Sequence, residues 1–224
     1  MHIPDGYLGP STCGFFYCLM LPIWALASRV VKKALSAQQV PMLAIGAAFS
    51  FVIMMFNIPI PGGSTGHAVG AVLVAILLGP WAACIAITVA LVIQALLFGD
   101  GGVTAIGANC FNMAFVMPFI GYYLYRLISY NCPVSSQRRI IAAGAAGYLA
   151  LNIAALFTGI EFGLQPLLHH TPQGVALYCP YGLNIAVPVM VIEHLLVFGW
   201  IEAVLTALVL KYLQKHSPQL LEFK

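Results

Sequence analysis

Long apolar runs dominate the chain between residues 12 and 212, and short stretches rich in glycine, proline or charge separate them. A helix needs about 20 apolar residues to cross the hydrocarbon core of a bilayer. The predicted fold class is therefore an all-α polytopic membrane protein with about seven transmembrane helices. These helices are predicted at residues 12–31, 41–57, 66–79, 80–98, 104–127, 139–159 and 187–212.

The dipeptide Gly79-Pro80 divides one very long apolar run, and it is compatible with either a kink or a turn between two helices. The positive-inside rule places clusters of basic residues on the cytoplasmic face. The first two clusters share that face only if an even number of spans separates them, so we interpret Gly79-Pro80 as a cytoplasmic turn between two spans, of which 66–79 is short. The basic clusters are Arg29, Lys32 and Lys33; Arg126, Arg138 and Arg139; and Lys211, Lys215 and Lys224.

This topology places the N-terminus outside the cell and the C-terminus in the cytoplasm of a multi-pass protein of the cell membrane. We expect a single domain over residues 1–224, with an external segment at 1–11, a helical bundle at 12–212 and a cytoplasmic tail at 213–224. The external face also receives the loops IPIPGGSTGH and FGDGGVTAIGAN, whose glycines and prolines favour tight turns.

Composition agrees with a protein of the lipid bilayer, because only 7% of residues are charged, 62% are hydrophobic and the mean hydropathy is +0.97. The nine basic residues are split among three membrane-flanking clusters, so we expect no nucleic-acid partner. The first residues lack the basic start of a signal peptide. The six cysteines show no CxxC spacing and are typical of small apolar packing residues.

The chain begins Met1-His2, and a free terminal amine followed by X-His is a metal chelator. The amine nitrogen, the amide nitrogen of His2 and the Nδ1 atom of His2 close a five-membered and a six-membered ring around one ion. The amide must lose its proton, which Cu(II) and Ni(II) can induce. Three coplanar nitrogens leave one corner of a square, the geometry that suits these two ions. Because His2 is bulky, we expect Met1 to be retained.

A fourth nitrogen is best supplied by His67, which lies in the predicted external loop IPIPGGSTGH. Zinc is disfavoured because its tetrahedral sites usually add cysteine or carboxylate ligands. The alternatives stay open from spacing alone, since His2 could be a solvated side chain and His67 could cap a helix. Because binding releases protons, affinity should fall steeply with acidification and be weak below the histidine pKa of about 6.5.

Several polar residues lie near this predicted site. Asp100 could orient an imidazole or attract a cation, or it could cap a helix. Asn109 and Asn112 could bond the N-terminal segment and fix its position, or bond a neighbouring helix. Ser64 and Thr65 are further candidates for contacts around the metal.

Five other polar residues have no settled role. His169 and His170 are either a metal relay or incidental residues of an external loop. Glu193 and His194 fall inside the last predicted span, where ionisable residues are costly and often functional. Glu202 lies deeper in that span, and we read it as either structural or a coupling element.

The segments MHIPDGYLGP, PGGSTGH and QALLFGDGGVTAIGANCFNMA resemble the NikM/CbiM family, and HLLVFGWIEAVLTALVL is similar to its last helix. The family comprises the substrate-binding (S) components of energy-coupling factor (ECF) transporters for nickel and cobalt. The resemblance implies a seven-helix protein whose N-terminal segment is tucked into its external mouth. It also implies that the Met1 amine, the His2 amide and imidazole nitrogens and the His67 imidazole bind Ni²⁺ or Co²⁺ as a transported ligand, not a cofactor.

The resemblance further implies partners: a transmembrane coupling (T) subunit, two cytoplasmic ATPase subunits and a small accessory membrane subunit. The chain has no GxxxxGK[ST] phosphate loop, so we expect no ATPase or other enzyme activity here. The predicted function is high-affinity capture of Ni²⁺ from outside. Alternatives are a cobalt-specific component feeding cobalamin synthesis, a stand-alone channel or permease, and an intramembrane metalloenzyme. The last is disfavoured because four planar nitrogens leave no open metal position and no HExxH motif occurs.

Overall fold

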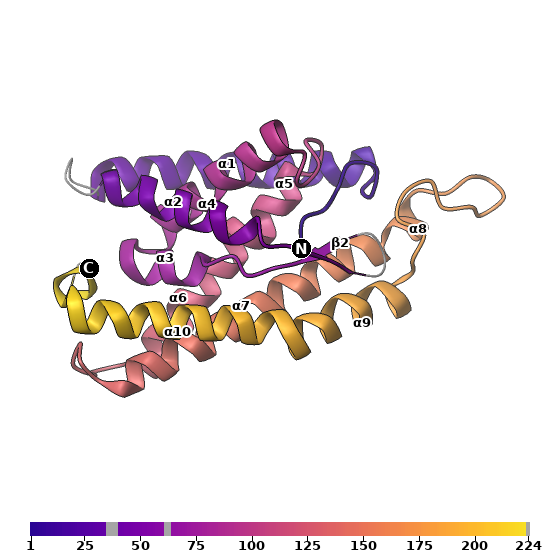
Figure 1. The fold of residues 1–224 in the computed structure, drawn as a ribbon. Coiled ribbons are helices and arrows are strands. Elements are labelled where there is room, and N and C mark those ends of the chain that lie inside the picture. The colour runs from indigo at the N-terminus through magenta and orange to yellow at the C-terminus, as the bar shows by residue number, and fades with distance from the viewer. Residues whose placement is uncertain (35–39, 61–63, 223–224) are drawn as a thin grey trace.

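The structure is a computed structural model that describes residues 1–34, 40–60 and 64–222. Helices account for most of this chain (Figure 1). They are α1 (Pro10–Ala34), α2 (Val40–Met54), α3 (Ala71–Leu78), α4 (Pro80–Ile93), α5 (Ile106–Asn109), α6 (Met117–Ile128), α7 (Gln137–Gly163), α8 (Gln165–Leu168), α9 (Leu183–Glu193) and α10 (Gly199–His216).

Three π-helical segments interrupt or extend these helices. Segment η1 (Gln94–Phe98) continues α4, η2 (Cys110–Val116) joins α5 to α6, and η3 (His194–Phe198) joins α9 to α10. A short 3₁₀ turn, η4 (Pro218–Leu221), follows α10. Strands β1 (Ile58–Ile60) and β2 (Ser64–Gly66) form a small antiparallel hairpin, and residues 61–63 of this predicted external turn lie outside the described residues.

Four stretches of the described chain are long and apolar enough to cross a membrane, and α2 is a shorter apolar helix. Each of the seven predicted apolar segments contains helix, but the number of spans remains a prediction. The four long stretches are Pro10–Ala34, Pro80–Phe98, Gln137–Leu168 and Leu183–His216.

The turn predicted at Gly79-Pro80 is confirmed. Helix α3 ends at Leu78, and Gly79 adopts a positive φ of 87°, a conformation that glycine reaches without strain. Pro80 then occupies the first turn of α4, where its missing N–H removes no helical hydrogen bond.

The helix predicted over residues 66–79 is shorter than expected, because residues 66–70 are not helical and α3 has only eight residues. Such a helix is about 12 Å long, far less than the hydrocarbon thickness. Residues 71–76 are all buried, and Figure 1 shows α3 between α2 and α10. A helix that is apolar on every side is stable in such a central position.

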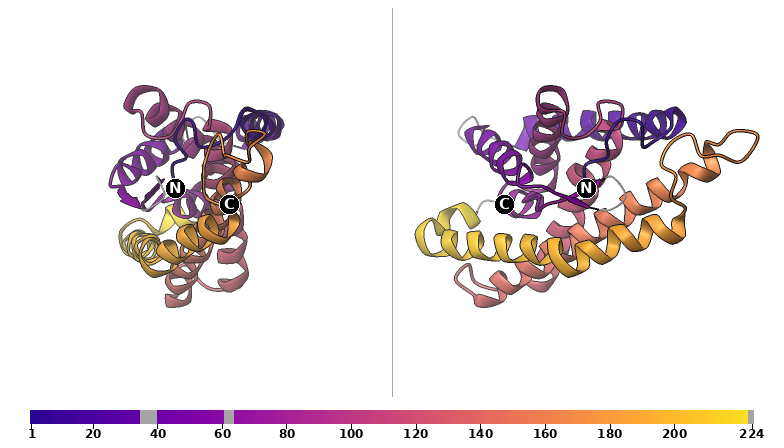
Figure 2. Two further views of the ribbon diagram at one scale, coloured as in Figure 1. Left: turned by 90° about the vertical axis from the view of Figure 1, so that its right-hand side faces the viewer. Right: turned by 45° about the vertical axis from the view of Figure 1, so that its right-hand side comes forward.

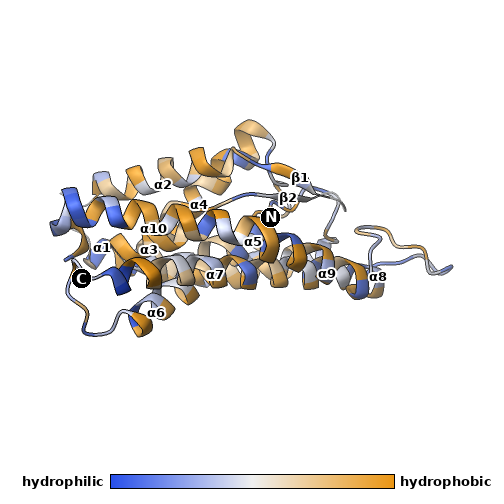
Figure 3. Ribbon diagram, turned by 60° about the horizontal axis from the view of Figure 1, so that its bottom comes forward, coloured by the Kyte–Doolittle hydropathy of each residue, from blue (hydrophilic) through white to orange (hydrophobic). Residues whose placement is uncertain are grey.

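The two ends of the bundle differ. The N-terminal segment, the hairpin and the α8 region lie toward one end, whereas the α6–α7 connection and the C-terminus lie toward the other (Figures 1 and 2). Basic residues occupy the last turns of α1, α6 and α10 at the second end. Strongly hydrophilic residues gather there, and hydrophobic residues line the helices between the ends (Figure 3).

Candidate metal centre

The N-terminal segment is buried inside the bundle. Met1, His2 and Ile3 are exposed by only 1%, 3% and 0%, and Figure 2 shows the N-terminus surrounded by helices in the end-on view. Burial of a terminal amine is costly unless its polar atoms find partners. The amine donates a hydrogen bond to the carbonyl oxygen of Thr65, on strand β2.

A side-chain amide holds the segment two residues from the amine. Asn109, at the end of α5, accepts a hydrogen bond from the Ile3 amide at 2.9 Å through Oδ1. Its Nδ2 group donates to the Ile3 carbonyl at 3.2 Å, and the Gly102 amide donates to the same carbonyl at 2.8 Å. These bonds satisfy the backbone of Ile3 inside the bundle and fix the direction of the first two residues.

The glycine-rich turn that follows η1 holds the outer part of the segment. The Asp5 carboxylate accepts hydrogen bonds from the Thr104 hydroxyl and from the amides of Thr104, at 2.9 Å, and Val103, at 3.1 Å. These bonds lower the pKa of Asp5, and the bond from the hydroxyl has the largest effect. The turn approaches so closely that a Cβ atom at Gly102 would lie 2.4 Å from the Asp5 nitrogen. Only glycine fits at this contact, which gives the sequence FGDGG a physical role.

Docking of the segment brings nitrogen atoms of three residues together. The Met1 amine nitrogen lies 3.2 Å from Nε2 of His67, and the ring centroids of His2 and His67 are 4.5 Å apart. His67 is itself buried, with 1% exposure. Two neighbouring corners of a square with metal–nitrogen bonds of about 2.0–2.1 Å are about 2.9 Å apart. The amine and the His67 nitrogen are thus close to the spacing of adjacent ligands.

Hydrogen bonds select the tautomer of each histidine. Nε2–H of His2 donates to Oε1 of Gln94 at 3.2 Å, because an amide oxygen only accepts. Nδ1–H of His67 donates to the carbonyl oxygen of Ala68 at 3.0 Å. The unprotonated nitrogens are therefore Nδ1 of His2 and Nε2 of His67, the atoms that would bind a metal.

Burial also removes competing protons from these groups. Loss of hydration lowers the pKa of the Met1 amine from 8.0 to about 4, although the negative charge of Asp100 opposes the shift. Burial, and then the nearby amine, lower the pKa of His2 to about 3. The same two causes place the pKa of His67 well below its usual value. All three groups are therefore neutral at pH 7 and already in the state that coordinates a cation.

Asp100 supplies a negative charge beside the nitrogens. Its Oδ1 atom lies 3.5 Å from Nδ1 of His2, and its Oδ2 atom accepts a hydrogen bond from Asn57 at 2.9 Å. Burial raises the pKa of Asp100, while the terminal amine and Asn57 oppose the increase. Thr65 contributes its carbonyl oxygen, and Ser64 is part of β2 with a side chain outside the described residues.

The two amides considered from the sequence have different partners. Asn109 bonds the N-terminal segment, whereas Asn112 donates to Thr158 and Glu161 on α7, at 3.1 and 2.9 Å. The interpretation of Asn112 as a second contact to the segment is therefore wrong. Its alternative, a bond to a neighbouring helix, describes the structure.

Sequence reasoning missed Gln94, which orients His2. The available signal was a single amide within the apolar run LVIQALLF, since polar residues in predicted spans are costly and often functional. Gln94 opens the π-helical segment η1, and such segments are frequent at functional sites.

Glu202 of α10 supports the loop that carries His67. Its carboxylate accepts hydrogen bonds from the amides of Val69, at 2.8 Å, and Gly70, at 3.0 and 3.1 Å. Both amides precede the first turn of α3, where a negative charge is favourable. The structure therefore gives Glu202 a structural contact; a coupling role remains a prediction.

The remaining histidines have separate contacts. His194 is fully buried in η3, and its Nδ1–H donates to the Met190 carbonyl at 2.7 Å. His169 forms a 2.7 Å hydrogen bond with the Ser11 hydroxyl and packs against Gly9, so it supports the start of α1. His170 is exposed at the edge of the α8–α9 connection.

The donor set relies on the backbone as much as on side chains. Within the described parts of the chain, no group of three or more His, Cys, Asp or Glu side chains is arranged to hold a metal ion. A terminal amine, one amide nitrogen and two imidazoles nevertheless converge at Met1, His2 and His67. Such nitrogen atoms suit Ni(II), Cu(II) and related late transition ions.

Comparison with known proteins identifies the relatives of this chain. Residues 2–220 match the family described as the cobalt uptake substrate-specific transmembrane region, CbiM. A probable fused nickel transport protein of Lactiplantibacillus plantarum is 54% identical over 97% of this chain and 66% of its own length. A putative metal transport protein of Methanocaldococcus jannaschii is 48% identical over 100% of this chain and 96% of its own length.

A solved structure has the same fold. The crystal structure of a truncated transition metal transporter superposes with a TM-score of 0.92 at 54% sequence identity, covering 96% of this chain and 99% of that one. The chain spans about two thirds of the length of the fused nickel transport proteins that it matches, at 66% and 64%. It shares the membrane region with these longer relatives.

Proposed function

This chain belongs to the CbiM family of substrate-specific transmembrane components for metal uptake, and we propose that it captures one Ni²⁺ ion from the external side. The proposed ligands are the Met1 amine, the His2 amide nitrogen, Nδ1 of His2 and Nε2 of His67. The observation that supports this most strongly is the 3.2 Å separation of the Met1 amine and the His67 imidazole inside the bundle.

The arrangement of ligands follows from chelate geometry. The amine, the amide and Nδ1 of His2 bind in sequence along three corners of a square, which leaves the corner opposite the amide. A ligand at that corner is adjacent to the amine, and His67 lies beside the amine at the required spacing. Gln94 orients one imidazole and the Ala68 carbonyl orients the other, so neither ring must change its tautomer on binding.

Nickel is the preferred substrate because square-planar nitrogen coordination strongly stabilises low-spin d⁸ Ni(II). The relative in Lactiplantibacillus plantarum is named as a nickel transport protein, whereas the family description names cobalt. Cobalt binding by the same atoms is therefore the direct competitor. Side-by-side titrations with both ions would distinguish them, and tighter cobalt binding would reverse the assignment.

Transport energy is proposed to come from partner subunits, namely a transmembrane coupling protein and two cytoplasmic ATPases of the ECF type, with a small accessory membrane protein. Support comes from the resemblance of the N-terminal and external-loop motifs to the substrate-binding components of such transporters. Proteoliposomes provide the test. Uptake should require the partners and ATP, and uptake by this chain alone would instead identify a permease.

The metal site is tested with purified protein that carries no N-terminal tag. We expect one nickel per chain and the d–d absorption band of yellow, planar nickel. Both should be lost in His2→Ala and His67→Ala, and both should be retained in His170→Ala, which removes an exposed histidine. Equal nickel content and an unchanged band in all three variants would exclude the proposed ligand set.

A further inference from the structure

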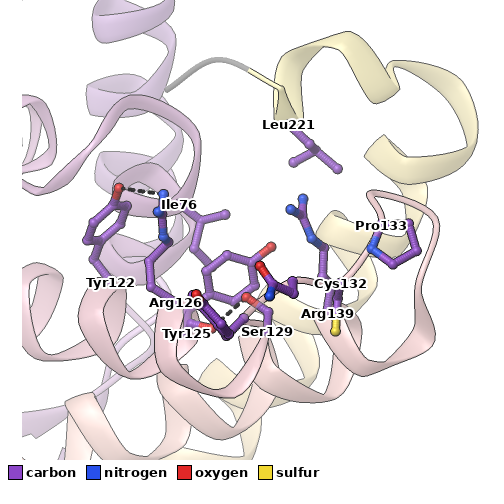
Figure 4. A pocket seen from close by; sticks show the side chains of 11 residues that line it. Ile76, Tyr122, Tyr125, Arg126, Ser129, Cys132, Pro133, Arg139 and Leu221 are labelled. Carbon is purple, nitrogen blue, oxygen red and sulfur yellow. Dashed lines mark hydrogen bonds between the residues drawn. The ribbon is translucent and has the colours of Figure 1, made fainter.

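A polar cavity of about 610 Å³ lies at the end of the bundle opposite the N-terminal segment. Its wall consists of the last turn of α6, the α6–α7 connection, the first turn of α7, and residues from α3 and η4 (Figure 4). It shares no residue with the metal centre. Its chemistry therefore requires a separate explanation.

Two arginines extend into this cavity without a carboxylate to balance them. Arg126 comes from α6 and Arg139 from α7 (Figure 4). Among the described residues, neither forms an ion pair with Asp or Glu, and Nε of Arg139 is buried without a hydrogen-bond partner. Arg126 is exposed and Arg139 is half-buried. A buried donor without a partner is costly, and an anion that accepts a hydrogen bond from Arg139 would remove this cost.

The neighbouring groups fit an oxyanion. Arg126 donates to the Tyr122 hydroxyl at 3.5 Å, and its guanidinium lies 5.9 Å from the centre of that ring, so it is held toward the cavity. Tyr125 and Tyr130 add hydroxyl groups to the wall, whereas the Ser129 hydroxyl already donates to the Tyr125 carbonyl at 2.6 Å. Guanidinium groups form paired hydrogen bonds with phosphate oxygens, and hydroxyls complete such a shell.

The surroundings of the cavity indicate a membrane lipid as the source of the phosphate. Tyr130 in the cavity wall is 72% exposed. On α6, Leu127, the residue after Arg126, is 73% exposed, and Tyr123 is also exposed. Exposed tyrosines beside basic residues are typical of the headgroup level of a bilayer. Basic pockets between helices on the cytoplasmic side bind anionic lipid headgroups, and the basic clusters predict that this end is cytoplasmic.

We propose that this cavity binds the phosphate of an anionic phospholipid from the cytoplasmic leaflet. The phosphate bridges Arg126 and Arg139 and thereby ties α6 to α7, while an acyl chain lies along the exposed apolar surface at Leu127. The bound lipid would fix the α6–α7 connection against Ile76 of α3 and Leu221 of η4, which line the same cavity.

The test measures lipid binding to the full, delipidated protein by native mass spectrometry. Phosphatidylglycerol should bind more tightly than phosphatidylcholine. The preference should fall about fivefold in Arg126→Gln or Arg139→Gln and about thirtyfold in the double variant. The matched control is Arg138→Gln, which removes an exposed charge adjacent in sequence but outside the cavity wall and should leave the preference unchanged.

Three results would overturn the proposal. Equal losses in Arg138→Gln would indicate attraction to overall charge, and displacement of phosphatidylglycerol by equimolar inorganic phosphate would indicate a site for free phosphate. The third result has two parts: phosphatidylglycerol fails to bind, and the double variant no longer assembles with the partner subunits. It would indicate that the cavity binds an acidic surface of a partner protein. Nickel binding by the same variants reports folding, because the substituted arginines lie outside the proposed metal site.

Discussion

Replacing Asn109 with alanine should weaken metal binding without touching a proposed ligand. Asn109 is the side chain that holds Ile3, one residue after the proposed chelate, through hydrogen bonds to its amide and carbonyl groups. Without this pair of bonds, the segment that carries Met1 and His2 is less firmly docked beside His67. Nε2 of His67, the fourth proposed ligand, would then lie within binding distance of the chelate in a smaller fraction of the molecules.

The size of the effect follows from the two hydrogen bonds. In Asn109→Ala the Ile3 carbonyl keeps the bond from the Gly102 amide at 2.8 Å, but the Ile3 amide loses the side-chain oxygen at 2.9 Å. A buried donor without an acceptor costs about 1–3 kcal/mol. Because the four nitrogens meet only in the docked state, nickel affinity should fall between about fivefold and about 140-fold.

The assay is competition with a chromogenic chelator, using untagged protein in detergent and parallel measurements of thermal stability. Asn112→Ala is the matched control, because Asn112 is also a buried amide, three positions along the chain, but it bonds Thr158 and Glu161 on α7. The control should lower the melting temperature and leave the nickel affinity of the folded protein unchanged.

Two outcomes would refute this reasoning. A folded Asn109→Ala protein that binds nickel as tightly as the wild type would mean that the hydrogen bonds to Ile3 do not position the chelate. An equal loss of affinity in Asn112→Ala would mean that general damage to the polar interior causes the effect.

Three further predictions concern the segment and its protons. Gly102→Ala should lower nickel affinity, because its Cβ would lie 2.4 Å from the Asp5 nitrogen. Gly14→Ala is the control and should bind nickel normally, because a Cβ there meets nothing within 4 Å. Identical nickel titration curves for the two variants would contradict this prediction. Gln94→Leu should weaken binding about 10–100-fold by releasing the His2 imidazole, and an unchanged affinity would exclude that role. The pKa of the terminal amine is lowered to about 4, that of His2 to about 3, and that of His67 well below its usual value. Between pH 5.5 and 7 we therefore expect binding to release only the amide proton. Nickel titrations should show affinity falling about tenfold for each unit of decrease in pH, because one proton is released. Ordinary pKa values of the amine and the imidazoles would give a steeper fall. Release of two or more protons per nickel ion would contradict the prediction.

Local sequence pattern predicted the positions of most helical segments, because hydropathy and the Gly79-Pro80 signal act over a few residues. It did not predict that residues 66–70 lie outside the helix. The Glu202 carboxylate bonds the amides of Val69 and Gly70 from more than 130 residues away, and Gly70 has a positive φ of 72°. This contact lies directly before the late start of α3 at Ala71, and no local pattern contains it.

The candidate donors were predictable for a similar reason, since the X-His chelate lies within the first two residues. The side chains around it were not. The π-helical segment η2 begins at Cys110, directly after Asn109, and a wider helical turn changes which side chains face a neighbour. Asn109 and Asn112 therefore point to different partners, although a regular helix would place both on one face.

The measurement that bears most directly on the proposed capture site is nickel binding by protein whose first nitrogen has been blocked. Acetylation of the Met1 nitrogen removes the amine as a ligand while keeping both imidazoles. We predict loss of the planar nickel band and of stoichiometric binding in a protein whose circular dichroism spectrum still shows folded helices. Undiminished binding by the acetylated protein would contradict a site built on the terminal amine.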